Sequence, residues 1–167
     1  MPNMSGRRDL LVFDISGKFC GLPVEDLSEI VPMALLSRPP SMPTIIEGFL
    51  NLRGTAVPVV SLSRMFRLPE RPLELYTPII VVRERGCPLA FLVDHVTQIL
   101  SLLVEDAVPL QKDHSFNDCA EAQVATTERV VHIFSSKRLL IEKERQCLSE
   151  FQVMEQRRLS ELQVMLP

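Results

Sequence analysis

The strongest limit on the fold of this chain is a series of short apolar runs, each of strand length and each followed by turn residues. Residues 11–15 alternate in hydrophobicity, Ser16-Gly17-Lys18 supplies a turn, and residues 19–22 form a returning arm. A period of two over such short runs predicts a β-hairpin. Thirteen prolines among 167 residues also favour many short segments bounded by turns.

Two further hairpins follow from the same pattern. Residues 45–62 place Arg53 and Gly54 near a turn, and residues 78–100 carry two arms rich in isoleucine, valine and leucine. Continuous apolar arms are typical of strands that are buried on both faces, which a closed all-β sheet explains. Pro58 lies inside one arm and has no N–H for a strand ladder, so its strand is expected to be an edge strand or to carry a bulge.

The segments outside the hairpins are expected to be short and varied. Residues 23–31 begin with a proline and two acids, which predicts about two helical turns. Three prolines make residues 35–44 an irregular connection, and the apolar spacing of residues 61–68 predicts a short helix. Residues 101–123 are predicted to be a mixed connection, and residues 127–135 the last strand.

From Ser136 onward the hydrophobic period becomes helical, and about 30 residues pass without glycine or proline. This pattern predicts one long helix. Within it LSEFQVM recurs as LSELQVM after 11 residues, which is three helical turns. Four apolar side chains consequently share one face: Leu148, Phe151, Leu159 and Leu162. Two alternatives stay open: the helix lies on its own domain, or it is an arm for dimerisation or docking.

Charge and composition argue against several classes of function. The chain has a formal net charge of −3 and 5% aromatic residues, which argues against binding to nucleic acid or to an anionic membrane surface. Its apolar runs are far shorter than the ~20 residues that span a bilayer, and its first residues lack a signal-peptide pattern. The four cysteines form no C-x-x-C pair, so reduced thiols and a cytoplasmic location are expected.

Motifs for catalysis or metal binding are missing from the sequence. The three histidines are not spaced as metal ligands, and the six glycines form no phosphate-binding loop. Asp94 and His95 are adjacent in a predicted strand, so their side chains should point to opposite faces and form no dyad. An enzyme would need one of these two residues, or a cysteine, in a cleft with a perturbed pKa. We therefore expect a binding module with no catalytic activity, metal or cofactor.

The order of these motifs resembles the CheW family, the coupling proteins of bacterial chemotaxis arrays. The most specific stretch is RPPSMPTIIEGFLNLRGTAVPVVSL, with N-L-R-G ahead of a V-P-V-V-like strand. LLVFDISGKFCGLPVEDLSEIV and IIVVRERGCPLAFLVDHVTQIL are similar to the family's opening hairpin and to its V-D-x-V hairpin. The resemblance implies a mainly β fold of two packed SH3-like β-barrel lobes with a groove between them and short helices. We expect this domain over residues 9–145, and an extension of the long C-terminal helix over residues 146–167.

The resemblance further implies a non-catalytic adaptor that joins the cytoplasmic tip of methyl-accepting chemoreceptors to the regulatory domain of a CheA-type histidine kinase. Ten residues match the motifs of partner-contacting segments or are expected to line the groove: Glu29, Ile30, Gly48, Asn51, Arg53, Gly54, Val93, Asp94, Val96 and Ile99. Arg53 suits a partner contact because a guanidinium offers a rigid fork of donors. The alternative for Arg53 is an internal salt bridge that pins the hairpin.

Three positions depart from the family pattern: Ser61 replaces a common aspartate, His95 replaces a usual glycine, and Ala90 stands where glycine is frequent. The glycine-rich run that is usual before the last strand is also missing from residues 117–131. A second interpretation therefore stays open. It is a divergent scaffold of a non-chemotaxis signalling pathway that uses the long helix for dimerisation or docking.

Overall fold

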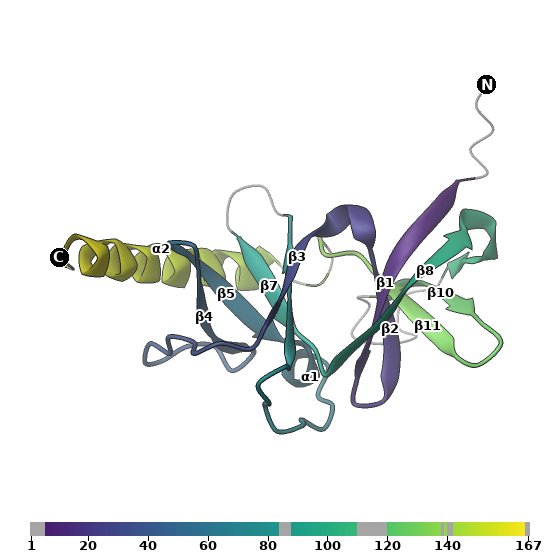
Figure 1. Cartoon of the computed structure of the whole chain (residues 1–167), viewed down its shortest axis with the longest axis horizontal. Helices are drawn as coiled ribbons and strands as arrows, with labels where there is room; N and C mark the ends of the chain where they lie inside the picture. Colours follow the sequence, from purple (N-terminus) through teal and green to yellow (C-terminus); the bar gives the residue numbers. More distant parts are fainter. Residues whose placement is uncertain (1–5, 84–87, 110–119, 138, 140–141, 166–167) are drawn as a thin grey trace.

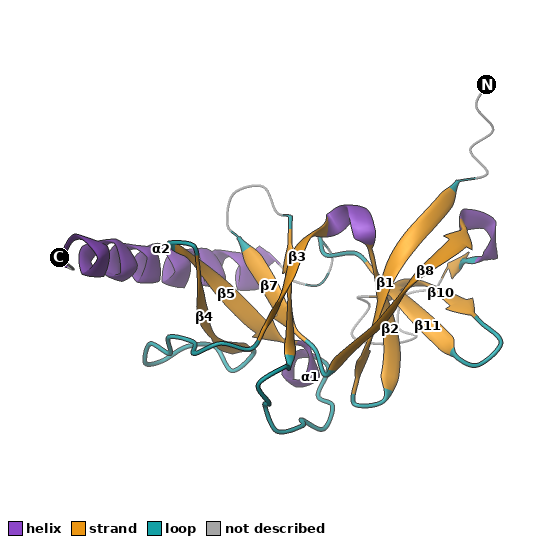
Figure 2. Cartoon of the chain, viewed as in Figure 1, coloured by secondary structure: helices purple, strands orange, loops and turns teal. Residues whose placement is uncertain are grey.

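The computed structural model describes residues 6–83, 88–109, 120–137, 139 and 142–165. The strands are β1 (Arg7–Ile15), β2 (Lys18–Pro23), β3 (Leu27–Pro32), β4 (Ile46–Leu52), β5 (Thr55–Ser61), β6 (Pro78–Val82), β7 (Leu89–Leu92), β8 (His95–Leu103), β9 (Val108–Pro109), β10 (Ala120–Ala125) and β11 (Val130–Phe134). The helices are α1 (Leu62–Met65) and α2 (Glu142–Met165), with the 3₁₀ turns η1 (Val24–Asp26) and η2 (Val104–Asp106). Strands dominate and a long helix lies at the C-terminal end (Figure 2), so the predicted mainly β fold is confirmed.

The strands form two sheets that lie side by side along the long axis of the molecule (Figure 1). The first sheet has the order β8-β1-β2-β11-β10-β9, and the second has the order β3-β6-β7-β5-β4. The chain passes from the first sheet to the second through η1 and returns after β7. α2 then runs back along the second sheet, where it contacts β5 and β4. The two sheets correspond to the two predicted lobes.

Both sheets bury side chains on both faces, which explains the continuous apolar runs in the sequence. On β1, Leu11 and Phe13 point into a central core, whereas Leu10 and Val12 point into a smaller core of the first sheet. The second sheet has a small core of its own. The central core joins both sheets to α2 through buried side chains that include Phe13, Phe91, Phe134 and Leu148. An arm that is apolar at every position needs a core on each side because successive side chains point to opposite faces.

Two hairpins turn on residue pairs with left-handed backbone angles. Between β1 and β2, Ser16 and Gly17 have φ values of 52° and 81°. Between β4 and β5, Arg53 and Gly54 have φ values of 50° and 89°. Consecutive positive φ angles give the tight turn that matches the twist of a hairpin, and glycine reaches this region without steric cost. The Gly54 N–H also donates to Asn51 Oδ1 at 2.9 Å. Both predicted hairpins are confirmed.

Residues 23–31 do not form the predicted two helical turns. Only η1 is helical, and β3 follows it at once. The side chains of β3 alternate between half-buried and exposed, and this strand pairs antiparallel with β6. Pairing with a strand that is distant in sequence therefore outweighs the local helix signals of a proline and two acids.

The hairpin predicted over residues 78–100 is correct in its first part. β6 and β7 pair antiparallel, and the predicted Arg85-Gly86 turn lies outside the described residues. The second arm ends with β7, because β8 belongs to the first sheet and pairs with β1. Asp94 makes this crossing, where its carboxylate accepts a hydrogen bond from the Ser16 N–H at 2.7 Å.

The C-terminal third also differs from the prediction. The connection expected over residues 101–123 contains η2, β9 and, beyond residues 110–119, the strand β10. β10 contains three alanines and one glutamate, which are poor strand formers, and it is held by pairing with β11. β11 is the predicted last strand. α2 begins at Glu142 rather than at Ser136.

Candidate partner-binding surface

An exposed arginine marks the turn between β4 and β5. Arg53 has 73% of its side chain exposed. Its guanidinium donates two hydrogen bonds to the Glu29 carboxylate on β3, at 2.5 Å to Oε1 and 3.3 Å to Oε2. The Glu29 side chain is 28% exposed. The pair joins the hairpin turn to an edge strand of the same sheet, so the internal salt bridge considered for Arg53 is present.

The ion pair shifts both pKa values away from neutrality. The hydrogen bond from Arg53 holds the pKa of the Glu29 carboxyl below its usual range, and the bond to Glu29 raises the pKa of the guanidinium. Both side chains are therefore charged near neutral pH. Because water reaches both partners, the pair adds little to folding stability.

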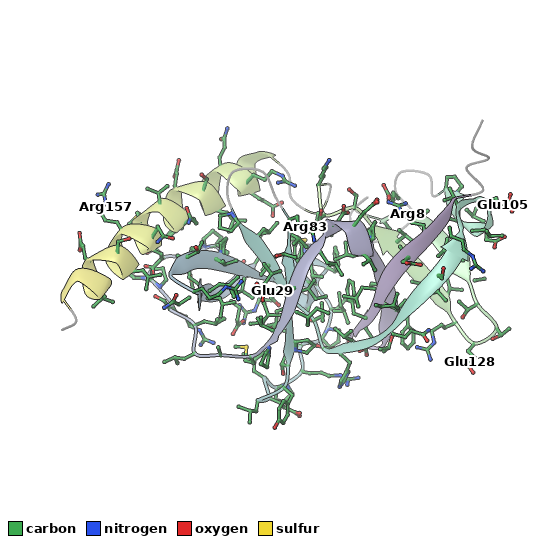
Figure 3. The ribbon with its side chains drawn as sticks, turned by 45° about the horizontal axis from the view of Figure 1, so that its top comes forward. Arg8, Glu29, Arg83, Glu105, Glu128 and Arg157 are labelled. Carbon is green, nitrogen blue, oxygen red and sulfur yellow. The ribbon has the colours of Figure 1, made fainter. Side chains whose placement is uncertain are left out.

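A shallow depression lies beside Arg53 on the second sheet. Its volume is about 490 Å³. We call it the Arg53 depression, and it is lined by Ser28, Leu52, Arg53, Thr55, Val57, Val81, Val82, Arg83 and Pro88. Figure 3 shows Glu29 on β3 and Arg83 just beyond the end of β6. Four strands and a hairpin turn thus meet around one recess.

Two glutamines of α2 bind the backbone of β5 and of its turn. Gln152 Nε2 donates to Ala56 O at 3.1 Å, and Gln156 Oε1 accepts from the Ala56 N–H at 2.8 Å. Gln156 Nε2 also donates to Gly54 O at 2.9 Å. These side-chain amides make the bonds that a neighbouring strand would make. The helix therefore lies on its own domain, and it holds the turn that carries Arg53.

Pro58 lies where α2 and β7 share one side of β5. β7 pairs with β5 over residues 59–61, and the glutamine bonds reach Ala56. Alternate residues of a strand direct their backbone groups to the same side, so Ala56 and Pro58 both face this side. Pro58, which has no backbone N–H, thus lies at the point of β5 between the bonds to α2 and the pairing with β7. β5 is central in the sheet rather than the expected edge strand. The first half of β5, however, does not pair with β7.

The start of β4 holds a second charge cluster, which is buried. The Glu47 side chain is 5% exposed and pairs with Arg38 at 2.8 Å and with Arg64 at 2.6 Å. The next residue, Gly48, is packed against the connection that precedes β4. A methyl group on its Cα would lie 2.9 Å from the Ser37 backbone oxygen. The structure thus places Gly48 in the interior rather than on a contact surface.

The V-D-H-V segment at the crossing between the sheets is only partly exposed. Val93 is 1% exposed and belongs to the central core. The Asp94 carboxylate lies 3.6 Å from Arg71 Nε, whereas His95 Nδ1 lies 3.0 Å from Asp14 Oδ1. The adjacent acid and histidine therefore engage separate partners, although both line one pocket.

The three residues predicted to line a groove lie on two different sheets. Ile30 is on β3 of the second sheet and is 43% exposed. On β8 of the first sheet, Val96 packs partly against the central core and Ile99 is 64% exposed. The two isoleucines thus offer exposed apolar surface on each sheet.

The sequence model of the CheW-like domain matches residues 9–144, which include strands of both sheets. This chain belongs to the CheW-like family. The resemblance of its motifs is therefore confirmed. The match ends inside α2, and the division at residue 145 between domain and helical extension stays a prediction.

Individual CheW proteins are similar to this chain over part of their length. It is 28% identical over 93 residues to the chemotaxis protein CheW of Bacillus subtilis and 28% identical over 106 residues to that of Helicobacter pylori. These alignments cover 56% and 64% of this chain, and 60% and 64% of the two relatives, which is less than two thirds of their length. The solved structure of the scaffolding protein TtCheW from Thermoanaerobacter tengcongensis matches with a TM-score of 0.72 at 25% identity, covering 77% of this chain and 88% of that one.

Two departures from the CheW pattern have local explanations. Ser61 replaces an aspartate, but its Oγ accepts from the Arg64 N–H at 3.4 Å and so caps α1 as a carboxylate would. Ala90 replaces a glycine on β7, where its methyl group is fully buried in the small core of the second sheet. Both substitutions are compatible with a CheW-like lobe.

Metal-ligand clusters and reactive thiols would be the signs of a chemical site in the described part of this CheW-like chain. Within those residues, no group of three or more histidine, cysteine, aspartate or glutamate side chains could hold a metal ion. Burial raises the pKa of the Cys20 thiol, which keeps it protonated and unreactive. None of the helices in the described ranges has the length and apolar character needed to cross a membrane.

The structure brings two pairs of the predicted residues together, Glu29 with Arg53 and Asn51 with Gly54. Gly48 lies apart from these two pairs, near the start of β4. Sequence reasoning missed three residues of this surface: Arg83, Gln152 and Gln156. The spacing of the glutamines, four residues apart, places them on one helix face, but only the fold shows which strand they meet. Arg83 begins the charged stretch Arg83-Glu84-Arg85 after an apolar run, which by itself is typical of an exposed turn.

Proposed function

We propose that this chain is a non-catalytic scaffold of bacterial chemotaxis that couples chemoreceptors to a CheA-type histidine kinase. Membership of the CheW-like family and similarity to a solved scaffolding protein support this role. The proposed partners are the regulatory domain of the kinase and the cytoplasmic tip of the receptor. This function would place the protein in the cytoplasm, at receptor arrays.

The observation that carries the proposal is the exposed guanidinium of Arg53 in the N-L-R-G segment. The tight turn, Glu29 and Gln156 hold this segment in place. A side chain whose orientation is already fixed loses less conformational entropy when a partner binds. Its donors suit a carboxylate or a carbonyl of that partner.

Replacement Arg53→Ala tests this contact. We expect the variant to lose capture of the kinase regulatory domain at an unchanged melting temperature, because the pair with Glu29 is exposed. Arg157→Ala removes an exposed arginine from α2 and should keep capture. Retained capture together with a large fall in melting temperature would assign Arg53 to the fold alone.

For the receptor, we propose that a helical tip docks between the sheets and buries an apolar stripe against Ile30, Val96 and Ile99. Amide chemical shifts measured with a receptor-tip peptide should change on β3 and β8, and Ile99→Ser should weaken the change. Shifts that are confined to α2 would reject this docking site.

A second candidate is a scaffold of another signalling pathway that dimerises through α2. It is favoured by apolar side chains that stay exposed on this helix: Val153 at 53%, Met154 at 51% and Leu162 at 59%. Light scattering across a concentration series would show a dimer, and Leu162→Glu would dissociate it. A monomer at every concentration would exclude this function.

A further inference from the structure

The charge of the Arg53 depression is opposite to that of the whole chain. The chain has a formal net charge of −3. Among the described residues that line the depression, the charged side chains are Arg53 and Arg83, and none is a carboxylate. A positive recess attracts an anionic group of a partner.

Both arginines keep donors for a ligand. Glu29 takes two hydrogen bonds from Arg53, and a guanidinium has further N–H groups. Arg83 is exposed and forms no ion pair with any described residue. Its backbone N–H donates to Asp26 O at 2.8 Å, which fixes the base of the side chain. Among the described residues, the two cations therefore flank one recess, and Glu29 is the acid that bonds one of them.

The lining between the arginines includes buried valines. Val57, Val81 and Val82 are 1%, 4% and 3% exposed, because their strands pack in the cores of the molecule. Val57 and Val81 point into the core of the second sheet and Val82 into the central core. The apolar side chains that reach the recess are those of Leu52 and Pro88, which are half-buried. The hydroxyl groups of Ser28 and Thr55 are exposed at the same recess and can bind a peptide carbonyl or N–H.

We infer that the Arg53 depression binds an acidic, apolar segment of a partner protein. A carboxylate of that segment lies between Arg53 and Arg83, and a neighbouring apolar side chain packs beside Leu52 and Pro88. The inference rests on the proposed scaffold function and names the chemistry of the partner segment. Arg83 is the new contact residue, because its charge has no internal partner in the described chain.

Peptide titration of the full-length protein tests the chemistry without any kinase. The probe is the capped peptide acetyl-Leu-Glu-Val-Asp-Leu-amide, and its analogue with glutamine and asparagine is the matched control. We expect amide shifts at Val57, Val81 and Val82 with the acidic peptide, and about tenfold weaker binding of the neutral analogue. Equal binding of the two peptides, or shifts that leave the depression unchanged, would overturn the inference.

Charge-removing variants locate the contact. Arg83→Gln should weaken the acidic peptide about tenfold, whereas Arg157→Gln removes the same charge from α2 and should have no effect. Binding that survives Arg83→Gln would overturn the role of Arg83. If sodium acetate alone produces the same shifts at the same concentration, the site takes a small carboxylate and the partner segment is rejected.

Titration with the kinase regulatory domain separates this inference from the proposed function. When wild-type protein binds the kinase and Arg83→Gln binds about tenfold less tightly, both are supported. When wild-type and Arg83→Gln bind equally, the scaffold function stands and the Arg83 contact is rejected. When wild-type protein does not bind, the scaffold function fails, and the peptide titration still decides what chemistry the depression accepts.

Discussion

The β4–β5 hairpin carries a charge pair at each of its two ends, and the two pairs differ in burial. At the start of β4, Glu47 is 5% exposed and is held by Arg38 and Arg64. At the turn, Arg53 is 73% exposed and reaches Glu29, which is 28% exposed. A buried carboxylate depends on its arginine partners, because without them its negative charge is neither paired nor solvated by water. An exposed pair exchanges easily with water or with a partner. Burial therefore separates a structural charge cluster from one that is available for contact.

The largest expected effect is at the buried end, where Gly48 has no room for a side chain. Gly48→Ala would place a methyl group 2.7 Å from Leu36 Cβ and 2.9 Å from Ser37 O. We expect a loss of about 3 kcal/mol in the free energy of unfolding, measured by urea denaturation. Gly17→Asn is the control, because that glycine has open space and a left-handed φ that asparagine tolerates. An unchanged midpoint for Gly48→Ala would show that the connection before β4 can move away.

Removing the buried charge should have the next largest effect. Glu47→Gln takes away the shared partner of Arg38 and Arg64, and we expect a loss of about 2 kcal/mol in the free energy of unfolding. Glu70→Gln is the matched control, because Glu70 also bonds Arg64 at 2.8 Å but is 52% exposed. Equal losses of unfolding free energy in the two variants would contradict the proposed difference between buried and exposed charges.

The contact between α2 and β5 should show an intermediate, local effect. Replacing Gln152 and Gln156 together by alanine removes three hydrogen bonds to the backbone of Gly54 and Ala56. We expect about 1 kcal/mol of lost protection at the Ala56 amide in hydrogen exchange. Gln146→Ala, at an exposed position of the same helix, should leave this amide unchanged. Unaltered protection in the double variant would mean that apolar contacts alone hold α2.

The smallest effect is expected at the exposed pair, and it should depend on pH. The pKa of Glu29 is lowered in the folded chain, so the pair stabilises the fold above the ordinary glutamate pKa of about 4.3. That contribution is lost as the pH falls through the lower folded value. Urea midpoints of wild type and Glu29→Gln should differ slightly at pH 7 and converge in acid. A difference that grows in acid would contradict the assigned direction.

Local patterns were sufficient for the hairpins and the long helix. Alternating and continuous apolar runs predicted β1 with β2 and β4 with β5, and a stretch without glycine or proline predicted α2. These patterns failed for β3, which was predicted to be helical and is paired with β6, and for β10, which contains three alanines and is paired with β11. The pattern also could not show that the chain changes sheets at Asp94. Strand pairing is a long-range interaction, and one strand's own residues carry little information about its neighbour.

The residues of the candidate site also fall into two groups, those that local sequence could identify and those that only the fold brings together. Arg53 and Gly54 were recognisable from the N-L-R-G motif. A hairpin turn with positive φ angles favours glycine, and Gly54 supplies one of the two positive φ angles here. Gly48 came from the same motif, yet it is buried and spatially separate. Arg83 joins the depression only because β6 ends beside the β4–β5 turn. A motif fixes residues that are close in sequence, whereas a recess gathers residues from several strands.

In the stretch NLRGTAVPVV, the sequence by itself determined a tight turn at Arg53-Gly54 and a following strand, since these depend on local φ preferences and on hydrophobic alternation. Only the tertiary structure decided the rest. It placed Glu29 on Arg53, and it placed the α2 glutamines and β7 along the same side of β5, before and after Pro58. The physical reason is that backbone hydrogen bonds must be satisfied wherever a strand is buried, and the partner that satisfies them can come from any part of the chain.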